Sequence, residues 1–85
     1  YGLAYNNRMK PQYQIVNHVR RYRRLAEITQ EDLAERIGVT RQTILSIEKG
    51  NYTPSVALAL QLAQVLGVRV EELFQLTKVD TNEQA

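Results

Sequence analysis

Cysteine is absent from this 85-residue chain, which excludes a disulfide scaffold, a thiolate zinc site and a cysteine nucleophile. Histidine is nearly absent: His18 is the only one, and a lone imidazole cannot assemble a metal site. Long hydrophobic runs are also missing. The longest stretch without a charge, residues 50–68, is 19 residues long, but it contains Asn, Thr, Pro, Ser and Gln, so it is too polar to span a bilayer. We therefore expect no metal, no cofactor and no membrane association.

The length allows one domain and is too short for most enzyme folds that bind two substrates. Apolar residues make up 44% and charged residues 24%, which is ordinary for a globular protein and argues against disorder. The first ten residues lack the apolar run of a signal peptide. These features predict a single-domain protein that is not an enzyme.

Charge is distributed unevenly along the chain. Residues 1–24 hold six basic residues and no acidic residue, whereas residues 69–85 hold two basic and four acidic residues. A basic region of this kind suits a polyanionic partner. The alternative is a solvated helix face, and charge alone does not decide between the two.

The apolar residues recur with a helical period, and no segment alternates as a strand does. Ile15, Val19, Tyr22 and Ala26 follow 4, 3, 4 spacing, which predicts a first helix with Arg20, Arg21 and Arg24 on its opposite side. Residues 30–37, 41–49 and 56–66 predict three more helices. A fifth is predicted by four apolar residues near the end: Val70, Leu73, Phe74 and Leu76.

Around this domain, expected at residues 14–77, lie an N-terminal arm (residues 1–13) and a polar C-terminal tail (residues 78–85). Met9 is the only methionine, so we expect the natural chain to begin there and residues 1–8 to be an addition. Inside the domain, Thr29 and Thr40 are expected N-caps, and Gly38 is expected to end the second helix in a left-handed turn.

Only three residues, Gly38, Val39 and Thr40, separate the second helix from the third, which is the spacing of a helix-turn-helix. Arginine and glutamine near a helix N-terminus suit paired hydrogen bonds to guanine and adenine edges. Free N–H groups at the starts of these two helices suit phosphate oxygens. The outward face of the third helix carries Arg41, Gln42, Leu45, Ser46 and Lys49, and the helix starts carry Thr29, Gln30, Thr40 and Thr43.

The stretch ITQEDLAERIGVTRQTILSIEKGNYTPS, followed by LALQLAQVLGV and EELF, resembles the phage-repressor and Cro-like helix-turn-helix regulators, often called the XRE family. The resemblance covers residues 17–74, about two-thirds of the chain. It implies an all-α fold, a compact five-helix bundle, that binds double-stranded DNA in a sequence-specific way. It also implies a homodimer on a pseudo-palindromic operator and a cytoplasmic, nucleoid-associated location.

The resemblance also implies roles for single residues. Arg41, Gln42 and Ser46 match base-facing positions, and Leu45 matches an apolar contact to a thymine methyl. Arg23 and Glu48 match a pair that ties the first helix to the third. The positions that match the phosphate-contacting set are Thr29, Gln30, Thr40, Thr43, Lys49, Asn51 and Tyr52. The sequence departs from the family at Glu27, where glycine is common, and at Arg69, where a capping residue is common.

Together these features favour a transcriptional regulator, with repression the expected mode, that reads the major groove with helix 41–49. One alternative is an antitoxin that binds a toxin protein and represses its own operon. A second alternative is a protein-interaction module that uses the same fold without a preference for any DNA sequence.

Overall fold

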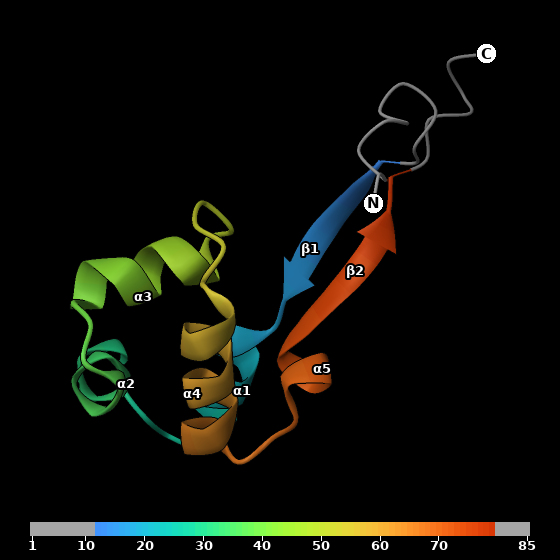
Figure 1. Cartoon of the computed structure of the whole chain (residues 1–85). Coiled ribbons are helices and arrows are strands. Elements are labelled where there is room, and N and C mark those ends of the chain that lie inside the picture. The colour runs from blue at the N-terminus through green and yellow to red at the C-terminus, as the bar shows by residue number, and fades with distance from the viewer. Residues whose placement is uncertain (1–11, 80–85) are drawn as a thin grey trace.

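The computed structural model describes residues 12–79, which form five helices and a two-stranded antiparallel sheet. The expected natural start at Met9, and most of the arm and tail, lie outside these residues. Figure 1 shows the helices gathered into one body and the two strands leaving it as a ribbon. In chain order the elements are β1 (Tyr13–Asn17), α1 (Val19–Leu25), α2 (Gln30–Ile37), α3 (Arg41–Glu48), α4 (Val56–Leu66), α5 (Val70–Leu73) and β2 (Phe74–Lys78).

The five helices confirm the predicted helix count, but the prediction of a purely all-α fold is wrong. Ile15 was placed on the first helix, and it lies in β1; Phe74 and Leu76 were placed on the fifth helix, and both lie in β2. Ile15 pairs with Leu76 in the antiparallel register. A five-residue segment is too short for hydrophobic spacing to separate the two periods, and aromatic and β-branched residues favour the strand.

The predicted caps Thr29 and Thr40, together with Ser55, set the starts of three helices. The hydroxyls of Thr29, Thr40 and Ser55 accept backbone N–H groups three residues on, at 3.0, 3.2 and 3.1 Å. Gly38 ends α2 in the left-handed conformation, with φ of 75°. Glu27 follows α1 at φ of 59°, a conformation that glycine adopts without strain.

One hydrophobic core joins all five helices. Val19, Leu33, Ile44, Ile47, Leu62 and Leu73 are completely buried in it. In α3 the two buried residues are three positions apart, so they fix the rotation of the helix about its axis and turn Arg41 and Gln42 to the surface. The ribbon is tied to this body at its foot, where the His18 N–H donates to the Leu73 carbonyl at 2.8 Å.

Candidate nucleic-acid interface

The exposed side of α3 carries the side chains that the sequence singled out for base contacts. Arg41 and Gln42 are exposed in its first turn, and Leu45 and Ser46 are half-buried one turn later. Arg41 and Leu45 lie on one flank of the helix, whereas Gln42 and Ser46 lie on the other. The helix therefore presents polar groups from its N-terminal half along a ridge with a hollow on each side.

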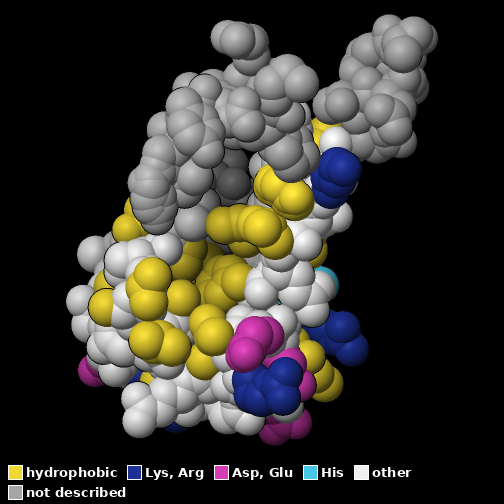
Figure 2. All heavy atoms as spheres, turned by 45° about the vertical axis from the view of Figure 1, so that its right-hand side comes forward, with side chains coloured by type: hydrophobic (Ala, Val, Ile, Leu, Met, Phe, Trp, Pro, Cys, Tyr) yellow, Lys and Arg dark blue, Asp and Glu magenta, His cyan; other side chains and the backbone are white. Residues whose placement is uncertain are grey.

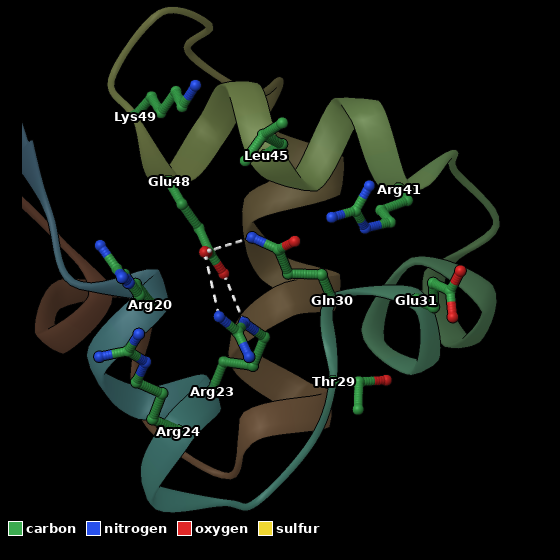
Figure 3. A pocket seen from close by; sticks show the side chains of 10 residues that line it. All are labelled: Arg20, Arg23, Arg24, Thr29, Gln30, Glu31, Arg41, Leu45, Glu48 and Lys49. Atoms are coloured by element: carbon green, nitrogen blue, oxygen red, sulfur yellow. Dashed lines mark hydrogen bonds and ion pairs between the residues drawn. The ribbon is translucent and has the colours of Figure 1, made fainter.

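The first hollow, of about 670 Å³, lies between α1, α2 and α3 and is drawn in Figure 3. Its lining includes five of the expected DNA-contacting residues: Thr29, Gln30, Arg41, Leu45 and Lys49. Lys49 and Arg41 come from opposite ends of α3, and Gln30 comes from the start of α2 below them. The cationic groups stand at the rim, which is the arrangement that a negatively charged backbone requires.

The floor of this hollow is a buried ion pair. Arg23 Nε donates to Glu48 Oε2 at 2.6 Å, and Arg23 Nη2 donates to Glu48 Oε1 at 3.2 Å. Only 11% of the arginine side chain and 3% of the glutamate side chain are exposed. Arg23 Nη1 also donates to the Ile28 carbonyl at 2.9 Å, so the loop between α1 and α2 is held by the same guanidinium.

Gln30 connects this ion pair to the surface. Its Nε2 donates to Glu48 Oε1 at 3.1 Å, and the side chain lines the hollow. Gln30 therefore fixes α2 against α3 through the same carboxylate that accepts hydrogen bonds from Arg23. A phosphate contact from Gln30 stays a prediction.

Two arginines at the hollow were not among the predicted site residues. Arg20 and Arg24 project from α1 toward the cavity that Lys49 also lines (Figure 3). They are four residues apart, so they share one helix face. The signal in the sequence was the run of four arginines between residues 20 and 24, but the apolar stripe alone placed Arg20 and Arg24 on a face with no assigned function.

The second hollow, of about 410 Å³, lies on the other flank of α3. It collects five more expected residues, which are Thr40, Gln42, Thr43, Ser46 and Tyr52. The Thr40 and Thr43 hydroxyls lie 3.0 Å apart and are hydrogen-bonded to each other. Asn51 lines neither hollow; its side chain is exposed, and its N–H donates to the Ser46 carbonyl at 2.9 Å.

The described residues hold no group of three His, Cys, Asp or Glu side chains that could bind a metal ion. Among the helices of residues 12–79, none is long and apolar enough to cross a membrane. The exposed side of α3 offers hydrogen-bonding groups and positive charge.

Comparison with known proteins gives the same picture. A family model described as "Helix-turn-helix" matches residues 19–73. An uncharacterized HTH-type transcriptional regulator of Methanocaldococcus jannaschii is 52% identical over 58 residues, which are 68% of this chain and 88% of that protein. The transcriptional repressor RstR of the cryptic phage CTXphi in Vibrio cholerae is 33% identical over 57 residues, 67% of this chain and 51% of that protein.

Among solved structures, the biofilm regulator SinR in complex with DNA superposes with a TM-score of 0.60 at 29% identity. The superposition covers 64% of this chain and 87% of that one. The residues that the family model matches, 19–73, include α3 and the residues that line its two hollows.

Proposed function

The chain belongs to the helix-turn-helix family of DNA-binding transcriptional regulators, and from that premise we propose that it is a repressor that binds a pseudo-palindromic operator as a homodimer. The observation that carries the proposal is the exposed position of Arg41 and Gln42 in the first turn of α3. An α-helix fits the major groove, where each base pair presents a distinct pattern of donors and acceptors. In this proposal Arg41, Gln42, Leu45 and Ser46 contact base edges.

Phosphate contacts hold the helix in the groove. The N-terminal N–H groups of α2 and α3, with Thr29, Gln30, Thr40 and Thr43, approach the backbone on either side of the reading residues. Lys49, Asn51 and Tyr52 extend these contacts past the end of α3. Arg20 and Arg24, which share the hollow with Lys49, add two cations to the same strand.

Repression is supported by the make-up of the described residues and by the name of one relative. Residues 12–79 form a DNA-binding body and a short ribbon, and occupation of an operator is sufficient to block other proteins from that DNA. RstR, which is named as a transcriptional repressor, is 33% identical. In this proposal the protein has no catalytic activity and acts at the nucleoid in the cytoplasm.

The second candidate is an antitoxin that binds a toxin protein and represses its own operon. Exposed hydrophobic side chains on the ribbon favour it, because such surfaces suit a protein partner. Purification of the tagged protein from its own host separates the two: a stoichiometric small protein that remains bound through salt washes supports the antitoxin, and the free protein supports the repressor.

Selection of bound duplexes from a random library tests the proposed function. We expect enrichment of two inverted half-sites whose centres are about one helical turn, 34 Å, apart. A library that shows no sequence enrichment, although the protein binds duplex at low salt, would contradict the reading role of α3. It would favour a module that uses the fold for protein contacts.

A further inference from the structure

The ribbon formed by β1 and β2 has two unlike faces. Side chains alternate along a strand, so Tyr13 and Ile15 of β1 share a face with Leu76 and Lys78 of β2 in the observed register. The opposite face carries the exposed Gln14 and Gln75, with Val16 and Thr77 half-buried among them. One face is therefore mainly hydrophobic and the other mainly polar, as in a sheet that covers something on one side only.

The hydrophobic face continues the core beyond the helical body. At the foot of the ribbon, on this same face, Asn17 Nδ2 donates to the Ile47 carbonyl at 3.1 Å, and Phe74 packs against the core. Farther out nothing covers it in the described part of the chain: Tyr13 is 53% exposed, Ile15 45% and Leu76 66%. An isolated two-stranded ribbon is marginal in water, so this face gains stability when it is covered.

The ribbon also lacks the charges that usually protect exposed strands. Among the residues of β1 and β2, Lys78 is the only charged one, and neither strand contains proline. Edge strands that must stay single usually carry several such residues, and the centres of protein interfaces are depleted of charge. The residue composition of the ribbon is therefore typical of a surface that contacts another protein.

The charges around this face complement one another. Lys78 lies at its outer end. The exposed Glu71 and Glu72 of α5 lie next to its foot, where Arg69 Nε is 3.9 Å from Glu71 Oε1, so these three side chains together carry one negative charge. Figure 2 shows hydrophobic side chains gathered from the ribbon onto the helical body, with a basic side chain above them and, below them, acidic side chains that have basic ones beside them. Two copies related by a two-fold axis and packed with their ribbons antiparallel bring the basic end of each to the acidic end of the other.

We propose that this ribbon face, defined by Tyr13, Ile15 and Leu76, is the surface on which a second copy of the chain docks. The proposal rests on the homodimer of the proposed function and names its surface. A stable dimer buries about 800 Å² on each partner, more than three side chains supply, so the adjoining surface of the helical body also takes part. Figure 1 shows the ribbon leaving the body away from the N-terminal end of α3, so docking leaves Arg41 and Gln42 of both copies free.

Sedimentation of the full chain without DNA tests the surface. We expect wild-type protein to have twice the 9.8 kDa chain mass at micromolar concentrations. Leu76→Lys introduces an unpaired charge at the contact and should raise the dimer dissociation constant about tenfold or more. Thr77→Lys, one residue away on the polar face, is the matched control and should leave that constant unchanged within about twofold.

A second pair of variants tests the same surface in case Leu76→Lys fails to fold. Because the sequence has no native cysteine, Leu76→Cys and Thr77→Cys each carry one thiol. Leu76 is the middle residue of β2, so we expect its thiol to form a covalent dimer under mild oxidation and the Thr77→Cys thiol to remain free. Circular dichroism establishes that each variant keeps the wild-type helix content.

Three results would overturn the inference. A wild-type monomer at every concentration means that another segment or another protein covers the face. A Leu76→Lys dimer as tight as wild type places the interface elsewhere, for example on α5, and so does equal cross-linking at residues 76 and 77. DNA binding is scored separately on a duplex with one half-site, where Leu76→Lys should match wild type. If wild type binds no duplex, the proposed function fails whatever the mass shows.

Discussion

Arg23 and Glu48 join α1 to α3 through two hydrogen bonds, 2.6 and 3.2 Å long, between a guanidinium and a carboxylate that are both largely buried. The carboxylate also accepts a hydrogen bond from Gln30 of α2, and the guanidinium also donates to the Ile28 carbonyl. The orientation of the reading helix therefore depends on a polar cluster beneath it as well as on hydrophobic packing. A displacement of this cluster would move Arg41 and Gln42 relative to the helix starts that face phosphate.

Glu48→Ala should be strongly destabilising. It leaves the Arg23 guanidinium buried with one remaining acceptor, and removal of one partner of a buried pair costs about 3–5 kcal/mol. In urea unfolding, the Arg23→Ala, Glu48→Ala double variant should lose less free energy than the sum of the single variants. Asp32→Ala is the control, because its pair with Arg36 is exposed and is worth at most about 1 kcal/mol. Additive losses in the Arg23–Glu48 cycle would show that the two residues act independently.

Glu27→Gly should raise the free energy of unfolding. Glu27 has φ of 59°, and a left-handed conformation costs a residue with a Cβ roughly 1 kcal/mol relative to glycine. The gain is reduced by the larger entropy of glycine in the unfolded chain, so we expect about 0.5 kcal/mol of net stabilisation. Glu35→Gly, at an exposed position inside α2, should instead cost about 1 kcal/mol. Thermal unfolding of both variants measures the difference in stability between them. Destabilisation by Glu27→Gly would mean that the Glu27 side chain makes a contact that stabilises the fold by more than the relief of backbone strain does.

The helix-turn-helix could be predicted from sequence because its boundaries are set locally. Thr29 and Thr40 cap the two helices through their own hydroxyls, and Gly38 supplies the left-handed turn between them, so each signal lies within three residues of its effect. The ribbon depends instead on pairing between Ile15 and Leu76, which are 61 positions apart. Neither strand is long enough to show the two-residue period of a strand by itself. The apolar residues of both strands also fit helical spacing, so they were assigned to the neighbouring helices.

The contribution of α1 to the cationic rim was missed for a related reason. Sequence spacing shows which residues share a helix face, but it does not show what that face meets. Arg20 and Arg24 lie opposite Lys49 only because Val19 and the buried Arg23 turn α1 in that direction. The run of arginines was visible, whereas its position beside α3 is a tertiary property.

Arg20→Ala and Arg24→Ala should weaken binding to all duplexes about equally. Each is proposed to neutralise one phosphate, so each should reduce the slope of log affinity against log salt by about 1. Arg36→Ala is the control, because Arg36 pairs with Asp32 on α2 and does not line the hollow. Fluorescence anisotropy at several salt concentrations gives the slopes. An unchanged slope for both α1 variants would remove α1 from the interface.

Gln42→Ala and Gln30→Ala separate base reading from support. Gln42 is exposed in the first turn of α3, where its carboxamide can make two hydrogen bonds to adenine, and the loss of such a pair costs about 1–3 kcal/mol and relaxes preference at one base pair. Gln30 already donates to Glu48 Oε1, which also accepts from Arg23, so its removal takes away one of the two hydrogen bonds to that oxygen and the proposed phosphate contact.

Gln42→Ala should therefore flatten one position in each half-site of the selected motif, whereas Gln30→Ala should lower affinity across the motif and leave its preferred bases unchanged. Gln64→Ala, at an exposed position on α4, is the matched glutamine control and should leave both affinity and motif as in wild type. The measurement is binding-site selection with wild type and the three variants at one salt concentration, because phosphate contacts vary with salt and base contacts much less. If Gln42→Ala keeps every preference, α3 does not read bases from its first turn. If Gln30→Ala changes the preferred bases, the hydrogen bond to Glu48 sets the angle of α3 in the groove.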